Sequence, residues 1–202
     1  MPQTVVIATG NIGKVSEFCA ILKDGAFCFF TSKEVGFYEE IEETAPTFKG
    51  NAEIKAKAVF EYISSKYKDY WVIADDSGLE VEALGGRPGV FSARYAGENA
   101  SGKDRYTKLL KEMEGLANRG ARFVCCLCLI RPGGLPEFFE GECKGTILTE
   151  PRGNGGFGYD PVFLPEGYTK GFGEMSEEEK NALSHRGRAI KNMLERLNEK
   201  KN

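Results

Sequence analysis

Short β-rich runs alternate with helical segments along this chain, and this alternation limits the folds that it can adopt. Residues 4–8 (TVVIA) indicate a buried strand, and residues 13–22 place their apolar side chains at helical spacing. Further strands are predicted at residues 26–31 and 71–74. Because strands and helices intermingle, the chain is predicted to have an α/β fold.

The remaining elements predict a mixed sheet. Residues 47–66 indicate a long helix that Thr47 caps, and residues 102–114 indicate another helix. Residues 122–130 and 137–146 indicate two strands joined by a hairpin-like link. A hairpin among helical crossovers requires both parallel and antiparallel pairs, so we expect a mixed β-sheet flanked by helices.

The composition excludes several classes of protein. The chain has 202 residues, with 27 Lys and Arg against 30 Asp and Glu, whereas a general nucleic-acid binder would be strongly basic. No apolar run approaches the ~18 residues that a membrane span needs. The N-terminal residues lack the basic region and the long apolar core of a signal peptide. We therefore expect a cytoplasmic protein without a nucleic-acid or membrane partner.

The cysteines and the single histidine narrow the chemistry. Three of the six cysteines lie in the apolar run FVCCLCLI, so they are predicted to be reduced cysteines of the core. His185 is the only histidine, which rules out a metal site built on several imidazoles within one chain. Any metal must then be held by carboxylates and water, which favours Mg²⁺ or Mn²⁺. A Ser-His-Asp triad lacks the G-x-S-x-G elbow that would support it.

The first candidate site is the turn from Thr9 to Lys14 (TGNIGK), between the first strand and its helix. Backbone N–H groups at a helix N-terminus favour an anion. Lys14 opposes the helix dipole unless it faces an anion as well. The spacing is not that of a Walker A loop, because Val15 stands where a metal-binding hydroxyl would follow the lysine. The alternative interpretation is a plain strand-to-helix connection.

Acidic residues form the second and third candidates. Asp75 and Asp76 come directly after a predicted strand, where α/β sheets place ligands, and two adjacent carboxylates require a cation. The alternative is an ordinary acidic turn. Residues 39–43 carry four glutamates in five positions, a pattern typical of a solvated loop. That loop would supply a second metal ligand only if the fold brings it beside Asp76.

Two further candidates lie in the C-terminal third. Phe157 stands among glycines and could stack on a base, with Asp160 accepting hydrogen bonds from a sugar or base edge. The alternative is a Gly-rich turn with core aromatics. Lys180, His185 and Arg186 cluster within seven residues, and Arg186 in a first helical turn indicates a negative or carbonyl-rich partner.

Five motifs occur in order between Thr9 and Gly187. They are T-G-N-x-G-K, A-D-D-S-G-L, G-G-x-P-G-x-x-S-A-R-Y, G-G-F-G-Y-D-P and S-H-R-G. In this order and spacing the chain resembles the inosine triphosphatase family, the noncanonical purine nucleoside triphosphate pyrophosphatases also called XTP/dITP diphosphatases. The chain departs from the family at Gly50, because the family commonly has an acidic residue before the Asn-Ala pair. Any ligand role of that acid is missing here.

The resemblance implies an activity and an architecture. It implies Mg²⁺-dependent hydrolysis of ITP, dITP and XTP to the monophosphate and pyrophosphate, with Mn²⁺ as an alternative metal. It implies a homodimer whose subunit is one domain, residues 1–202. That domain would have an elongated mixed sheet and two lobes around a central cleft.

The matching motifs carry the family's site residues onto this chain. The triphosphate would be held by Thr9, Gly10, Asn11, Ile12, Gly13 and Lys14, and Ser77 would lie beside the substrate. Asp76 would be the metal ligand and proton acceptor. Glu42 matches the second metal ligand, with the register against Glu43 left open. The base pocket would contain Phe157, Gly158, Tyr159, Asp160, Lys180, His185 and Arg186.

The chemistry fits that assignment. We expect in-line attack of water at the α-phosphorus, with Asp76 taking the proton and Lys14 stabilising the leaving pyrophosphate. Charged donors in the base pocket would favour the 6-keto oxygen of hypoxanthine over the 6-amino group of adenine. The competing hypotheses are a regulatory module that binds nucleotides without turnover, a P-loop kinase or GTPase, and a pyrophosphatase for other modified nucleotides. The regulatory module would not need the acid pair, and the S-H-R-G segment disfavours the last of these.

Overall fold

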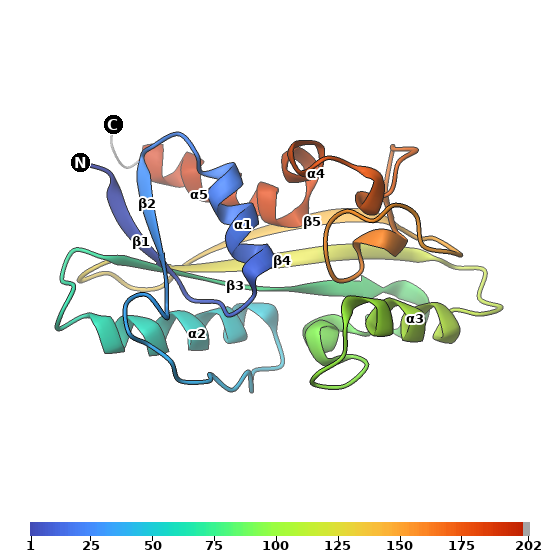
Figure 1. The fold of residues 1–202 in the computed structure, drawn as a ribbon, viewed down its shortest axis with the longest axis horizontal. Helices are drawn as coiled ribbons and strands as arrows, with labels where there is room; N and C mark the ends of the chain where they lie inside the picture. The colour runs from blue at the N-terminus through green and yellow to red at the C-terminus, as the bar shows by residue number, and fades with distance from the viewer. Residues whose placement is uncertain (200–202) are drawn as a thin grey trace. The chain divides into compact units, whose positions relative to one another are not determined.

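The computed structural model describes residues 1–199 and contains one six-stranded sheet in the order β2-β1-β3-β4-β5-β6 (Figure 1). The strands are β1 (Gln3–Ile7), β2 (Phe27–Thr31), β3 (Trp71–Val81), β4 (Gly120–Ile130), β5 (Glu137–Ile147) and β6 (Phe163–Pro165). β1 pairs in parallel with β2 and β3, whereas β5 and β6 are antiparallel. The sheet is therefore mixed, and the predicted α/β class with a mixed sheet is confirmed, whereas the two lobes around a central cleft stay a prediction.

Local capping signals set where several helices begin. The helices are α1 (Ile12–Ile21), α2 (Phe48–Ile63), α3 (Gly102–Glu112), α4 (Glu177–Leu183) and α5 (His185–Glu199). Thr47 caps α2 as predicted, because its side-chain oxygen accepts the Gly50 N–H at 3.1 Å. Among the described residues, none of these helices has both the length and the apolar character needed to span a membrane.

The predicted end of the third strand was wrong. We expected a strand over residues 71–74 that ends before Asp75, but β3 continues through Asp75 and Asp76 to Val81. Successive side chains of a strand point to opposite faces, so the two carboxylates do not compete for one partner. Asp75 contacts Lys14 from α1, and Asp76 contacts Lys55 from α2. With a cation on each side, the strand can carry two buried acids.

The chain divides into two compact units. Unit 1 comprises Met1–Asp76, Cys126–Glu140 and the residues from Ala189 onward, and unit 2 comprises Ser77–Cys125 and Gly141–Arg188. The organisation as a single domain over residues 1–202 stays a prediction, and residues 200–202 lie outside the described part of the chain.

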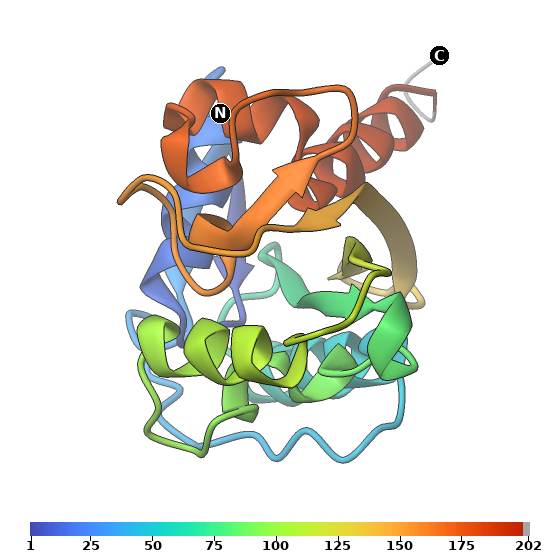
Figure 2. The ribbon, with the colours of Figure 1, turned by 90° about the vertical axis from the view of Figure 1, so that its right-hand side faces the viewer.

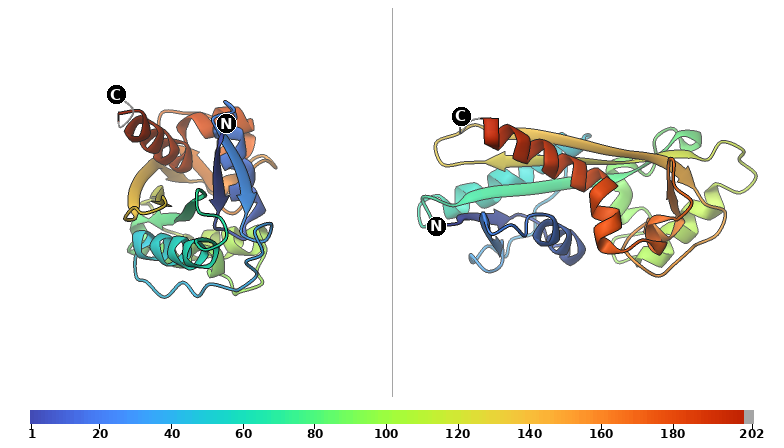
Figure 3. Two further views of the ribbon diagram at one scale, coloured as in Figure 1. Left: turned by 90° about the vertical axis from the view of Figure 1, so that its left-hand side faces the viewer. Right: turned by 90° about the horizontal axis from the view of Figure 1, so that it is seen from above.

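The core of unit 1 follows the pleat of its strands. Alternate residues such as Val6, Val72 and Ile130 pack with the apolar face of α2. Their neighbours Val5, Ile73 and Leu129 border an apolar space shared with the α5 residues Met193 and Leu197. Figure 3 shows α2 in blue-green and α5 in dark red on opposite sides of these strands. Helices on both faces explain why strands of this unit are apolar along their length.

The core of unit 2 is aromatic. Phe123 lies 4.7 Å, centroid to centroid, from Phe163 and 5.9 Å from Phe172. Leu109 of α3 and Met113, the C-cap residue of that helix, are fully buried in the same core. Figure 2 views the chain from the right-hand side of Figure 1, with α3 in yellow-green.

The predicted core cysteines of β4 are buried. Cys125, Cys126 and Cys128 are buried reduced thiols. Burial raises the pKa of Cys126 and of Cys128 to about 12. These thiols are therefore packing residues rather than nucleophiles.

Candidate active site

The turn between β1 and α1 is held by its own side chains. The Thr9 hydroxyl oxygen accepts the Asn11 N–H at 3.2 Å, and Asn11 Oδ1 accepts the Lys14 N–H at 3.3 Å as the N-cap of α1. Gly10 and Ile12 are exposed, and Gly13 is partly exposed. The turn therefore presents a helix N-terminus whose other free N–H groups can meet an anion.

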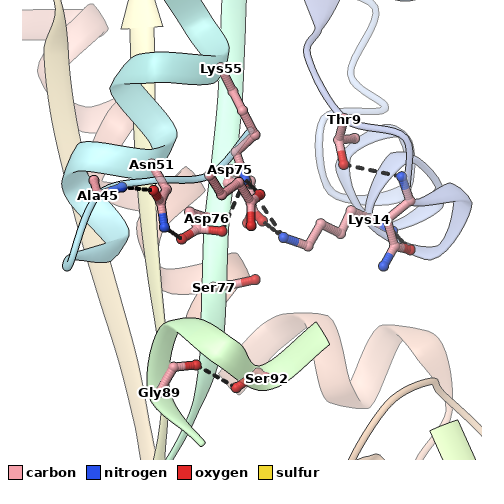
Figure 4. A network of polar contacts seen from close by, with 12 residues as sticks. Thr9, Lys14, Ala45, Asn51, Lys55, Asp75, Asp76, Ser77, Gly89 and Ser92 are labelled. Atoms are coloured by element: carbon pink, nitrogen blue, oxygen red, sulfur yellow. Dashed lines mark hydrogen bonds and ion pairs between the residues drawn. The ribbon is translucent and has the colours of Figure 1, made fainter. Parts of the chain in front are cut away.

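Lys14 reaches from α1 to β3. Its ammonium forms an ion pair with the carboxylate of Asp75 and lies 3.5 Å from the Asp75 carbonyl oxygen (Figure 4). Asp75 is fully buried, so this ammonium compensates a carboxylate that water cannot reach. Lys14 was predicted as a phosphate ligand, and the structure places it beside the first acid of the pair.

Asp76 is bound at both of its oxygens by α2. Lys55 Nζ lies 2.9 Å from Asp76 Oδ1, and Asn51 Nδ2 donates to Asp76 Oδ2 at 3.3 Å (Figure 4). Asn51 and Lys55 are four residues apart and so lie on the same side of the helix. Burial raises the pKa of Asp76, although Lys55 and Lys14 act in the opposite direction.

Lys55 also binds the acidic segment, residues 39–45, which carries four glutamates. Its ammonium lies 2.6 Å from Glu43 Oε1, so one buried cation is shared by Glu43 and Asp76. Burial acts to lower the pKa of Lys55, but these two carboxylates outweigh it and keep the pKa above its ordinary value. Glu42 is exposed, and its assignment as the second metal ligand stays a prediction.

The donor set suits a hard divalent cation. Glu43 and Asp76 already share one positive charge, that of Lys55, which shows that their oxygens converge on a single cation. Among the described residues, no group of three or more Asp, Glu, His or Cys side chains could hold a metal by itself. Mg²⁺ is commonly held by one or two carboxylates plus water and substrate phosphates, so two carboxylates are compatible with it.

A second group of polar residues lies within unit 2. Lys180 Nζ lies 2.5 Å from Asp160 Oδ2, which also accepts the Phe157 N–H at 2.7 Å. Lys180 Nζ stands 4.7 Å from the centroid of the Phe157 ring. Gly156 permits this arrangement, since its φ is +71° and a Cβ there would lie 2.1 Å from Asp160 Oδ2.

Arg186 is buried in the same unit. Its side chain is only 1% exposed, and Nη2 donates to the Ser77 hydroxyl at 2.8 Å. Its guanidinium carbon lies 5.9 Å from the Phe157 ring centroid. His185, the preceding residue, stacks on Phe123 at 4.7 Å with an interplanar angle of 10°. Ser77, Phe157 and Arg186, predicted from three separate motifs, are thus brought together.

Tyr159 has a role that its motif did not reveal. Its buried hydroxyl donates to the Ser92 carbonyl oxygen at 2.9 Å, and burial raises its pKa well above 10. Ser92 accepts the Leu79 N–H and donates to the Gly89 carbonyl oxygen, the latter drawn in Figure 4. The hydroxyl of Tyr159 therefore fastens the Gly-rich loop of residues 84–97 to the motif that contains Phe157.

We name these two groups by their charge. The acidic cluster of unit 1 is Glu43, Asp75 and Asp76 with Lys14 and Lys55. The basic cluster of unit 2 is Lys180 and Arg186 with Asp160, Ser77 and Phe157.

The sequence analysis missed Asn51 and Lys55, the two α2 residues that contact Asp76. Asn51 and Lys55 lie on the buried side of α2 among Ala52, Ala56 and Val59. A lysine and an asparagine inside an apolar stripe indicate buried polar partners, and that signal could have found them.

Comparison with known proteins assigns the chain to a family. Residues 5–196 match the Ham1 family. A protein of Halalkalibacterium halodurans named dITP/XTP pyrophosphatase is 46% identical over 190 residues, covering 93% of this chain and 95% of that protein. A Bacillus licheniformis protein with the same name is 47% identical over 193 residues, covering 95% of this chain and 96% of that protein.

Solved structures agree with these relatives. The Ham1 protein of Staphylococcus aureus superposes with a TM-score of 0.85 and 38% identity, covering 99% of this chain and 100% of that one. A HAM1 protein from Coxiella burnetii gives the same TM-score at 37% identity, covering 98% and 99%. The resemblance inferred from the five motifs is confirmed. This chain belongs to the Ham1 family.

Proposed function

We propose that this chain is a nucleoside triphosphate pyrophosphatase that converts ITP, dITP and XTP into the nucleoside monophosphate and pyrophosphate. The observation that carries the proposal is identity of 46–47% to proteins named dITP/XTP pyrophosphatase, over more than nine-tenths of both chains. The two polar clusters supply the chemistry that such a reaction needs.

The acidic cluster is the group proposed to bind the polyphosphate and its metal ion. The turn from Thr9 to Lys14 offers backbone N–H groups and one ammonium to the phosphates. Asp76 and a glutamate of the acidic segment, Glu43 by contact or Glu42 by motif, would hold Mg²⁺. Bound there, Mg²⁺ would offset phosphate charge and lower the pKa of a coordinated water.

Asp76 is the proposed proton acceptor. It takes the proton from the water that attacks the α-phosphorus, and Lys55 and Asn51 hold its carboxylate in one orientation. Lys14 stabilises the charge that develops on the leaving pyrophosphate. Lys55 compensates the carboxylates before substrate arrives, because unpaired buried charges would be costly.

The basic cluster is the group proposed to bind the purine base. Phe157 offers a ring for stacking, and Lys180, His185 and Arg186 offer hydrogen-bond donors. These donors pair with the 6-keto oxygen of an oxopurine, whereas the 6-amino group of adenine is itself a donor and cannot accept their hydrogen bonds. Each hydrogen bond lost in this way would cost about 1–3 kcal/mol, which disfavours ATP.

A product assay tests the function. Purified protein with Mg²⁺ is incubated with ITP, XTP, dITP, GTP, ATP and dTTP, and pyrophosphate and orthophosphate are measured separately. We expect pyrophosphate release that is fastest with ITP, dITP and XTP. Orthophosphate as the main product would indicate γ-phosphoryl chemistry, and tight ITP binding without turnover would indicate a regulatory module.

Two further properties belong to the same proposal. We propose a homodimer, which sedimentation equilibrium tests at micromolar concentration. We also propose a cytoplasmic location, because the substrates are members of the nucleotide pool. Fractionation of cells that express the natural chain tests this directly.

A further inference from the structure

Asn51 uses both ends of its side-chain amide inside unit 1. Its Oδ1 accepts the Ala45 N–H at 2.9 Å, and its Nδ2 donates to Asp76 Oδ2 at 3.3 Å (Figure 4). The residue is completely buried, so water cannot replace either hydrogen bond. Asn51 thus joins the acidic segment to β3.

The acidic segment is closed onto the start of α2 by neighbouring contacts. The Asn51 N–H donates to the Thr47 carbonyl oxygen at 3.1 Å, within the turn that Thr47 caps. Ala45 approaches Gly50 so closely that a Cβ on Gly50 would lie 2.6 Å from the Ala45 Cβ. The missing side chain at position 50 therefore allows Ala45 to reach Asn51.

Asn51 and Lys55 form two parallel connections between the acidic segment and Asp76. Asn51 connects Ala45 with Oδ2, and Lys55 connects Glu43 with Oδ1. Both start from the same side of one rigid helix. The orientation of the Asp76 carboxylate and its distance from Glu43 are thus set by α2.

We propose that Asn51 is a positioning residue for the reaction at Asp76. It orients the carboxylate so that one oxygen is held by the amide and the other by Lys55. It also fixes the position of the acidic segment relative to β3. The proposal rests on the proposed function, since it assigns Asp76 the reacting role. The amide suits this role because its nitrogen donates to Asp76 while its oxygen accepts from Ala45.

The test uses Asn51→Asp, which keeps size and the acceptor for Ala45 but removes the donor to Asp76. The matched control is Asn192→Asp, the same change at an exposed helical asparagine of unit 1. We expect kcat for ITP to fall by about 30-fold or more with KM changed less than about threefold, because positioning acts on the chemical step. Asn192→Asp should match the unchanged chain. A kcat for folded Asn51→Asp within twofold of the unchanged chain would overturn the proposal.

A second measurement tests the Asn51–Asp76 contact even where a variant folds poorly, and it does not depend on turnover. Thermal unfolding is compared for Asn51→Asp, for Asp76→Asn and for the double variant that carries both changes, called the exchanged pair. In the exchanged pair, the new amide at position 76 can donate to the new carboxylate at position 51. We expect the exchanged pair to melt at least about 3 °C above Asn51→Asp while remaining inactive. No recovery would show that the contact is unimportant and would overturn the proposal. If the unchanged chain releases no pyrophosphate, the proposed function fails, whereas recovery would still support the Asn51–Asp76 contact.

Discussion

The acidic cluster of unit 1 and the basic cluster of unit 2 bury opposite excesses of charge. In the acidic cluster, three carboxylates face two ammonium groups. In the basic cluster, Asp160 is the carboxylate that pairs with Lys180, and Arg186 adds a second cation that contacts the neutral Ser77 hydroxyl. A buried excess of one sign favours a ligand of the other sign, because it lowers the cost of desolvation.

The difference in charge indicates that the two clusters bind different parts of a ligand. The acidic cluster presents carboxylate oxygens, so it suits a metal ion and the phosphates bound to that ion. The basic cluster presents charged hydrogen-bond donors, so it suits the carbonyl oxygens of an oxopurine. Asp76 and Ser77 are consecutive, so β3 supplies a side chain to each cluster. Changes in the first cluster should affect turnover, and changes in the second should affect base selectivity.

Asp76→Asn should have the largest effect. We expect kcat with ITP to fall by about 10²–10⁴-fold, since the proposed general base is lost, while the affinity for inosine monophosphate stays within about twofold. Steady-state kinetics and calorimetric titration of the monophosphate measure the two quantities, with the exposed Asp69→Asn as the control. An equally large loss of affinity for inosine monophosphate would contradict the proposal that the acidic cluster serves turnover and the basic cluster serves base binding.

Lys180→Met should mainly reduce stability. The change leaves the buried Asp160 carboxylate without its ammonium, and breaking a buried pair costs about 3–5 kcal/mol. Urea unfolding measures the free energy. Lys170→Met, at a largely exposed lysine that pairs with Glu179 at the surface, should change it by less than about 1 kcal/mol. Similar losses for both variants would contradict the burial argument.

Arg186→Met should narrow the preference for ITP over ATP. Methionine keeps much of the buried volume but removes the donors, so the ratio of kcat/KM for ITP to that for ATP should fall about tenfold. The exposed Arg188→Met serves as the control and should leave the ratio unchanged. If Arg186→Met keeps the preference for ITP over ATP, other residues must discriminate between the two bases.

Gly50→Ala should have the smallest effect. Alanine normally stabilises a helical position, but here its Cβ would lie 2.6 Å from that of Ala45. We expect the free energy of unfolding, measured by thermal denaturation, to fall by about 1–2 kcal/mol, because overpacking outweighs helix propensity. Adding Ala45→Gly should restore stability. A stabilised single variant would mean that the acidic segment moves aside without cost.

The sequence predicted those features of the fold that depend on local patterns. Thr47 was identified as a helix cap because the capping hydrogen bond is local, and Glu137–Ile147 was found because its neighbouring strand is joined by a short link. The continuation of β3 through Asp75 and Asp76 was not predictable by pattern. Two acids usually indicate a turn, and only Lys14 and Lys55, distant in the chain, make a buried strand tolerable.

The motifs predicted many of the residues that the clusters contain, but they did not predict the contacts that hold those residues in place. Lys55 and Tyr159 illustrate the limit. Lys55 lies on a helix whose pattern indicates packing, and its two carboxylate partners are 12 and 21 residues away in the chain. The hydroxyl of Tyr159 bonds to a carbonyl 67 residues earlier. Such connections depend on tertiary structure, so a single sequence does not contain them in readable form.

The alternation of Asp75 and Asp76 has a consequence for the evolution of this strand. Inserting or deleting one residue upstream in β3 would exchange the faces of the pair and direct each acid away from its lysine. Substitutions at nearby apolar positions change volume only and can be absorbed by repacking. Natural variation in β3 should therefore consist of exchanges of side chains, with insertions and deletions confined to the connections at either end.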